Sequence, residues 1–158
     1  MNKTEFILIK QSYGLVVNDF VNHCHVSSQS VVDWRAEKYK VPQKVIDWLD
    51  KLSFFEQKVA GIADSMVTEA KNKPLEFSKP NIAILIYPDD KVFWEFNPDM
   101  SFVPAKTHAI FMARLARDIK NYYDSSIVIF DKKSYLKWLG DKEDSQGLRS
   151  AWAGEQVR

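Results

Sequence analysis

The chain has 158 residues, of which 46% are hydrophobic and 27% are charged, and its formal net charge is +1. This balance is typical of one folded domain or two small ones, and it excludes an intrinsically disordered chain. No apolar run approaches the roughly 20 residues that span a bilayer, and the first residues lack the apolar core of a secretory signal. Cys24 is the single cysteine, so an internal disulfide is excluded. We therefore expect a cytoplasmic protein without a membrane partner.

The first seventy residues have apolar side chains at helical spacing, which predicts consecutive short helices. The segments with this spacing are residues 6–13, 15–24, 31–34, 45–52 and 55–70. Gly14 is expected to end the first helix, and Ser27 is placed to cap the third. Pro42 stands where a fourth helix begins, since a proline there costs no hydrogen bond.

The second half of the chain predicts a mixture of strands and helices. The apolar runs 82–87 and 92–96 indicate two strands, and the turn residues Pro88 to Lys91 between them indicate a hairpin. Further expected elements are a helix at 109–123, a strand at 126–130, a helix at 135–139 between Asp131 and Gly140, and a weak helix around Leu148 and Trp152. Because the character changes between Pro74 and Pro80, we expect two domains, residues 1–73 and 78–158.

The second and third predicted helices have the spacing that a helix-turn-helix requires. Two helices in that motif bury facing apolar residues, and the second helix keeps its other side polar for the major groove. Val31 and Trp34 supply the inner side of the third helix, and the residues from Ser27 to Ser30 give it a polar start. The same spacing fits an ordinary helical hairpin.

The stretch from Val26 to Trp34, Val-Ser-Ser-Gln-Ser-Val-Val-Asp-Trp, resembles the phage-repressor-like (Xre-type) helix-turn-helix family. The step of eight residues from Trp34 to Pro42 is similar to that of YdiL-like proteins and the anti-CRISPR-associated repressors. The resemblance covers about residues 4–52. It implies an α+β protein of bacterial or phage type, in which an all-helical lambda-repressor-like domain precedes a small mixed α/β domain used for dimerisation.

Five positions depart from the family pattern, among them Arg35, where glutamate commonly follows the tryptophan, and Glu37, where glycine is usual. Val16 and Val17 replace the polar residues that usually begin the second helix, which removes a cap and a phosphate contact. His25 stands at a turn position that the family gives to glycine; if that position needs a positive φ, histidine is tolerated there but strained. These departures concern the contacts with DNA more than the fold.

Other chemistry is poorly supported by the residues present. His23, Cys24 and His25 are adjacent, and neighbouring residues on a helix point about 100° apart, so they cannot converge on one metal ion. Asp89 and Asp90 follow a proline and read as turn residues. Since no glycine-rich phosphate loop or nucleophile motif is present, we expect no catalytic residues, no metal and no cofactor.

Aromatic residues gather near the predicted hairpin, at Phe93, Trp94, Phe96 and Phe102. Aromatic side chains on a small sheet can stack on single-stranded bases. The more common role is a core or a buried dimer surface, and we favour that interpretation.

The sequence thus predicts a regulator of transcription, a homodimeric repressor that binds a double-stranded DNA operator. Ser27 would cap the recognition helix, whose groove-facing residues would be Ser28, Gln29, Val32 and Asp33. The residues expected to flank phosphates are Asn18, Ser30, Arg35, Lys38, Tyr39 and Lys40. The alternative is a protein-interaction module, of antitoxin or adaptor type, whose helical domain does not read DNA; the near-neutral charge favours that alternative.

Overall fold

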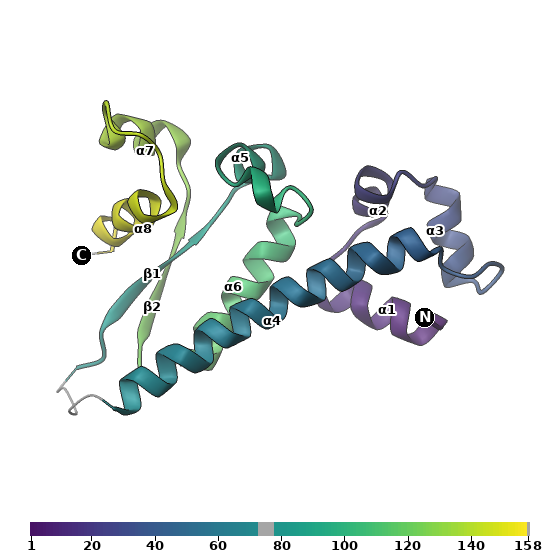
Figure 1. The fold of residues 1–158 in the computed structure, drawn as a ribbon, viewed down its shortest axis with the longest axis horizontal. Coiled ribbons are helices and arrows are strands. Elements are labelled where there is room, and N and C mark those ends of the chain that lie inside the picture. Colours follow the sequence, from purple (N-terminus) through teal and green to yellow (C-terminus); the bar gives the residue numbers. More distant parts are fainter. Residues whose placement is uncertain (73–77, 158) are drawn as a thin grey trace.

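The computed structural model describes residues 1–72 and 78–157, which form many helices and one small sheet. Figure 1 shows an elongated molecule with the first three helices at one end and the strands at the other. The elements in chain order are α1 (Lys3–Ser12), α2 (Val17–Cys24), α3 (Ser28–Arg35), α4 (Gln43–Lys71), β1 (Asn81–Ile86), α5 (Asp90–Phe96), the 3₁₀ turn η1 (Pro98–Met100), α6 (Ala105–Ile119), β2 (Asp124–Ile129), α7 (Lys132–Leu139) and α8 (Gln146–Glu155). This helix-rich, mixed architecture agrees with the predicted α+β class.

Local signals in the sequence set the ends of the first three helices. At the start of α1 the Asn2 side chain accepts the Glu5 N–H at 2.9 Å, and the Glu5 carboxylate accepts the Asn2 N–H at 2.8 Å. Gly14 follows α1 with φ of +65° and allows the chain to turn. The Ser27 Oγ accepts the N–H of Ser30 at 3.1 Å, so the predicted cap of the third helix is confirmed.

The expectation of short consecutive helices is wrong for residues 43–71. The two predicted segments form one helix, α4, of 29 residues, which makes it about 43 Å long at 1.5 Å per residue. Pro42 precedes it at the N-cap. No proline lies within this stretch, so no residue forces the helix to end midway. Gly61 is in open space, since a Cβ added to it would meet no atom within 4 Å. Its buried residues recur at helical spacing, as Val45, Trp48, Leu49, Leu52, Val59 and Ala63.

The predicted hairpin at 82–96 is also wrong. The run 92–96 lies in α5, because Asp89 acts as a helix cap rather than as a turn residue. Its Oδ1 accepts the Val92 N–H at 2.8 Å, which fixes the first turn of the helix. Asp90 accepts the N–H of Ala105 at 2.6 Å, so this carboxylate fastens α5 to the start of α6.

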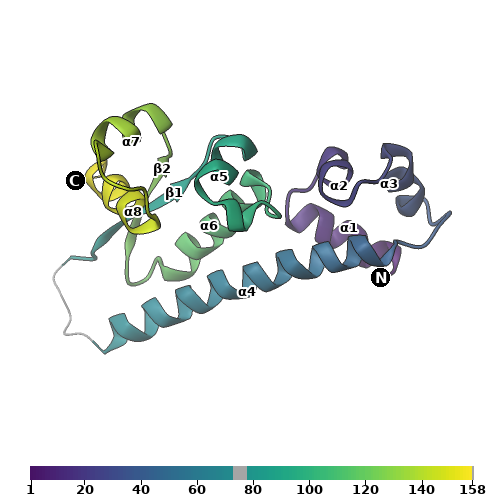
Figure 2. The ribbon, with the colours of Figure 1, turned by 45° about the horizontal axis from the view of Figure 1, so that its top comes forward.

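The sheet consists of β1 and β2, which run parallel. Ile84 pairs with Ile127 and Ile86 with Ile129, while α5, η1 and α6 form the crossover between the strands. Both α6 and α8 pack against β1. In Figure 1, and again in the turned view of Figure 2, α6 lies on the side of the strands that faces α1 and α8 lies on the opposite side.

The remaining elements of the second half match the expectation from the sequence. The strand predicted at 126–130 and the helices predicted at 109–123 and around Leu148 correspond to β2, α6 and α8. Asp131 caps α7 by accepting the Ser134 N–H at 2.7 Å, and Gly140 follows that helix with φ of +60°.

One continuous hydrophobic core joins the helical first half to the mixed second half. The Tyr13 and Phe111 rings meet edge to face at 5.2 Å, and the Trp48 indole N–H donates to the Phe102 carbonyl oxygen at 2.8 Å. The aromatic residues Phe93, Trp94, Phe96 and Phe102 all belong to this core or pack against it, as we expected. The predicted boundary begins at Pro74, which lies outside the described residues, and the division into two domains stays a prediction.

Across residues 1–72 and 78–157, no helix has both the length and the apolar character needed to cross a bilayer.

Candidate nucleic-acid interface

A turn of three residues, His25, Val26 and Ser27, connects α2 to α3. His25 has φ of 50° and ψ of 54°, so this turn position does have the positive φ at which histidine is tolerated but strained. The Lys44 Nζ, from the start of α4, donates to the His25 carbonyl oxygen at 3.2 Å. No sequence pattern predicts this contact, since the two residues are 19 positions apart. The turn is therefore held both by its own backbone and by α4.

The start of α2 has only half of a capping pair. Val16 is the N-cap residue and offers no side-chain acceptor, as its residue type predicts. The Asp19 carboxylate accepts the Val16 N–H at 2.6 Å and supplies the reciprocal bond. Burial raises the pKa of Asp19, and the bond to the Val16 N–H opposes that rise.

The inner side of α3 is fixed by aromatic packing. Val31 and Trp34 are buried, as predicted for the inward side of the helix. The Phe6 ring from α1 meets the Trp34 ring edge to face, with centroids 6.0 Å apart, and lies 5.4 Å from the Phe20 ring of α2. Because three helices meet at these rings, α3 has one orientation relative to α1 and α2.

The opposite side of α3 is open to solvent. Ser28, Gln29, Val32 and Arg35 are exposed there, with the Val32 side chain 47% exposed. The Gln29 Nε2 donates to the Asp33 Oδ1 at 2.9 Å. This surface, defined by Ser28, Gln29, Val32 and Arg35, is called the α3 face below.

Asp33 is half-buried beside the α3 face and has two partners. Besides Gln29, the Lys38 Nζ lies 3.5 Å from the same Oδ1. A carboxylate that faces a lysine repels an approaching phosphate less than a bare one does. Asp33 therefore positions Gln29 and Lys38 in this structure.

The residues expected to flank phosphates lie on both sides of the α3 face along the chain. Asn18 is exposed in the first turn of α2, and Lys38, Tyr39 and Lys40 are exposed in the connection between α3 and α4. Tyr39 is the most exposed of the large hydrophobic side chains described, at 68%. Ser30 differs from these four, because it is half-buried and its hydroxyl lies 2.8 Å from the Ser27 hydroxyl.

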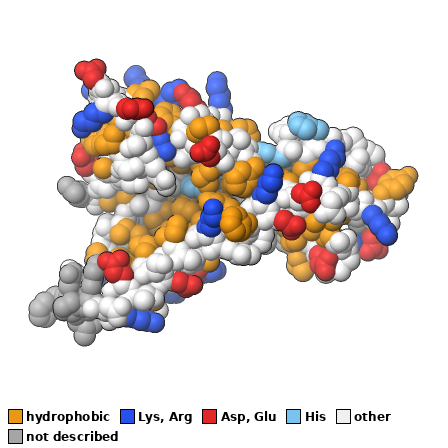
Figure 3. Space-filling view, viewed as in Figure 1, with side chains coloured by type: hydrophobic (Ala, Val, Ile, Leu, Met, Phe, Trp, Pro, Cys, Tyr) orange, Lys and Arg blue, Asp and Glu red, His pale blue; other side chains and the backbone are white. Residues whose placement is uncertain are grey.

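The charge around the α3 face is mixed. Between Arg35 and Lys44 the chain has four basic residues, Arg35, Lys38, Lys40 and Lys44, against Glu37 alone. Figure 3 shows lysine and arginine side chains interspersed with carboxylates over the end of the molecule that holds α1 to α3. The basic character is local, so an electrostatic contact with DNA here involves a few phosphates rather than a broad field.

The adjacent residues His23, Cys24 and His25 have separate environments. The His23 ring stacks on Trp48 with centroids 4.9 Å apart, while Cys24 is buried and His25 is exposed. Burial raises the pKa of the Cys24 thiol, which makes a reactive thiolate unfavourable. In the described part of the chain, no three His, Cys, Asp or Glu side chains gather as metal ligands.

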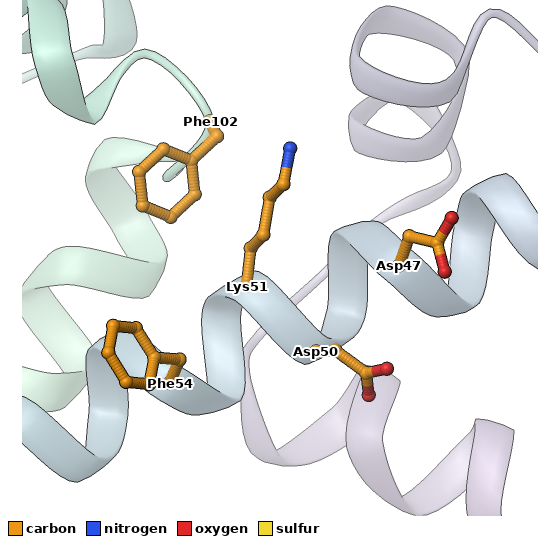
Figure 4. Close-up of a pocket in the computed structure, with 5 residues that line it drawn as sticks. All are labelled: Asp47, Asp50, Lys51, Phe54 and Phe102. Carbon is orange, nitrogen blue, oxygen red and sulfur yellow. The ribbon is translucent and has the colours of Figure 1, made fainter.

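An open groove lies on α4, opposite the loop that leads into α6. It has a volume of about 460 Å³ and is lined by Asp47, Asp50, Lys51, Phe54 and Phe102. In Figure 4 the Phe54 and Phe102 rings and the Lys51 side chain lie on one side, while the Asp50 carboxylate points away. Among these lining residues no nucleophile is paired with a base.

No known family model matches this chain, and no curated protein is significantly similar to it. The function is therefore inferred from the α2–α3 geometry and from the side chains around it.

Proposed function

We propose that this protein is a sequence-specific regulator of transcription, a homodimeric repressor that reads an inverted repeat in double-stranded DNA through the major groove. The observation that carries the proposal is the α3 face. The helix α3 begins at the capping residue Ser27 after a turn of three residues, and Val31 and Trp34 on its opposite side are buried. A recognition helix needs this combination of a rigid inner side and an exposed polar outer side.

The residues of the α3 face suit the reading of base edges. The Gln29 amide offers a donor and an acceptor side by side, which complements N6 and N7 of adenine. Val32 lies three residues further along the same face and is suited to contact with a thymine methyl group. Ser28 adds a hydroxyl at the start of the helix, where side chains enter the groove most deeply.

The phosphate contacts are assigned to Arg35, at the end of the α3 face, and to the exposed residues that follow it. Arg35 ends α3, and Lys38, Tyr39 and Lys40 follow it in the connection to α4. Such contacts fix the position of the protein on the duplex without reading its sequence. A bacterial or phage regulator of this kind works in the cytoplasm, needs no cofactor and catalyses no reaction.

A second candidate is a protein-interaction module in which the α3 face contacts another protein. The observations that favour it are the net charge of +1 and the absence of a side-chain cap at Val16. Nucleic-acid-binding domains often have a strong basic excess, and this chain does not.

Selection from a pool of random duplexes separates the two candidates. The purified protein is incubated with the pool at about 0.1 M salt, and bound duplexes are recovered and sequenced over several rounds. We expect enrichment of one inverted repeat, because a dimer reads two half-sites about 34 Å apart or a multiple of that distance. A pool that stays random after selection would contradict the DNA-binding proposal and favour the protein partner.

A further inference from the structure

The sheet has an outer edge at β2 that the described part of the chain leaves uncovered. The helices α6 and α8 both pack more extensively against β1 than against β2. A sheet of two strands is only marginally stable by itself in water. Completion of the sheet by a further strand would therefore add stability to this end of the molecule.

The backbone of β2 has a row of hydrogen-bonding groups on this outer edge. The Asp124 N–H donates to the Pro80 carbonyl oxygen at 3.0 Å, and the Phe130 N–H donates to the Ile86 carbonyl oxygen at 2.8 Å. In a parallel sheet, every second residue of a strand directs both its backbone N–H and its C=O group to the same neighbouring strand. The odd-numbered residues Ser125, Ile127 and Ile129 therefore direct their N–H and C=O groups away from β1.

The side chains of β2 are apolar where a solvent-facing edge is usually protected. Natural edge strands are guarded by lysine, proline or a bulge, which prevent pairing with another chain. The segment from Ser125 to Ile129 contains none of these, and Ile127 and Ile129 are 52% and 62% exposed. Their register partners Ile84 and Ile86 are less exposed, since the helices shield β1.

We propose that β2 pairs antiparallel with β2 of a second copy of this chain, so that the two sheets form one sheet of four strands. This inference rests on the homodimer of the proposed function and names its interface. The pairing is symmetric, because the same strand is used by both copies around a twofold axis. In this register Ile127 of each copy pairs with Ile129 of the other copy, so the exposed Ile127 and Ile129 side chains of both copies would be buried.

The charges at the two ends of β2 favour the antiparallel direction. Asp124 stands at the start of the strand, and Lys132 and Lys133 follow its end. Antiparallel copies bring the acidic start of one strand near the lysines of the other, whereas parallel copies would place like charges together. Lys132 also pairs with Glu95 at 2.5 Å, and the exposed Lys133 remains available to the partner.

The same pairing suits the arrangement of the whole molecule. Figures 1 and 2 show α6 and α8 on opposite faces of the sheet, with α6 on the face toward the α1–α3 end. The twofold axis between neighbouring antiparallel strands is perpendicular to their sheet. It therefore keeps α6 and the α1–α3 end of both copies on the same side of the joined sheet, as binding to one duplex requires.

Sedimentation equilibrium of the full chain without DNA tests this interface. We expect the wild type to sediment as twice its mass of 18.3 kDa at micromolar concentration. Ile127→Pro removes an N–H that points to the outer edge and leaves the bonds between β1 and β2 intact, so this variant should sediment as a monomer. Ile129→Lys, a substitution of an exposed side chain, should raise the dissociation constant at least tenfold.

The matched control is Phe54→Lys, which places a lysine at an equally exposed apolar residue on α4 and should remain a dimer. Circular dichroism establishes that each variant is folded, and Ile129→Lys decides the question if Ile127→Pro unfolds. A monomeric wild type at 100 μM, or folded β2 variants that stay dimeric, would overturn the interface. Because no DNA is present, failure of DNA binding leaves this measurement unchanged and is scored separately.

Discussion

The imidazole of His23 on α2 stacks on the indole of Trp48 on α4, with ring centroids 4.9 Å apart and an angle of 15° between the planes. The edge of Trp94 on α5 meets the same imidazole at 5.4 Å. His23 thus contacts both the helical half and the mixed half of the molecule. Burial lowers the pKa of His23, so the neutral ring is the form that fits this stack.

A second buried histidine predicts how stability depends on pH. His108 lies 4.7 Å from the Phe93 ring, and burial lowers its pKa from 6.5 to about 4. In the unfolded chain His108 binds a proton at a higher pH than it does in the folded protein. The stability that comes from its neutral, buried imidazole is therefore intact above pH 6.5 and is lost as the pH falls toward 4. The shift predicts a loss of about 2 kcal/mol between pH 7 and pH 5 from this residue.

Urea unfolding of the wild type and of His108→Leu at pH 7, 6 and 5 checks this value. The variant should lose less stability on acidification, and it also removes the Nδ1 atom, which is buried without a hydrogen-bond partner. Identical pH dependence in the two proteins would show that His108 is not buried in the neutral form.

Two glycines should respond to alanine in opposite directions. Gly14 has φ of +65°, and a Cβ added there would lie 2.5 Å from the Ile110 Cδ1 of α6. Gly14→Ala should therefore lower the free energy of unfolding by at least about 1 kcal/mol. Gly61→Ala, in the open interior of α4, should raise it by about 0.5–1 kcal/mol. Thermal unfolding measures both, and a neutral Gly14→Ala would contradict the close contact between the α1–α2 turn and α6.

The phosphate contacts are tested by the salt dependence of DNA binding. Arg35→Gln or Lys38→Gln should weaken binding to selected and unrelated duplexes alike, and each should reduce the slope of log K against log salt by about 0.9. Lys142→Gln changes an exposed lysine at the other end of the molecule and should leave the slope unchanged. A change of sequence preference with an unaltered slope would mean that Arg35 and Lys38 are assigned to the wrong role.

The base-reading role of Gln29 has a close control in the same chain. Gln29 and Gln43 each donate to an aspartate four residues ahead, Asp33 at 2.9 Å and Asp47 at 2.8 Å. Gln29→Ala should cost about 1–3 kcal/mol on the selected duplex and little on unrelated DNA, whereas Gln43→Ala should have no effect on either. Equal losses on both duplexes at one salt concentration would show that Gln29 positions the protein without reading a base.

The sequence predicted those parts of the fold that depend on neighbouring residues. The caps at Ser27 and Asp131 are local, and residue type alone predicts them. The sequence does not predict the full length of α4, because the apolar pattern is interrupted at residues 53–54. No residue there breaks a helix. The hairpin was a false prediction because the apolar run 92–96 fits strand and helix equally, and the cap at Asp89 decides between them.

Only the local features of the candidate site can be predicted from the sequence. The inward side of α3 follows from the spacing of Val31 and Trp34, and the outward side follows by exclusion. The bond from Lys44 to the turn and the ring contacts of His23 join distant segments, so only the folded structure reveals them. The partners of Asp33 also depend on the path of the chain after α3.

The central claim is that the α3 face reads a DNA sequence, and the affinity ratio between two duplexes measures it most directly. Fluorescence anisotropy at one fixed salt concentration gives Kd for the selected inverted repeat and for a scrambled duplex of the same composition. We predict that the selected duplex binds at least about 10³-fold more tightly, the lower bound for specific recognition. Equal Kd values for the two duplexes would contradict the account.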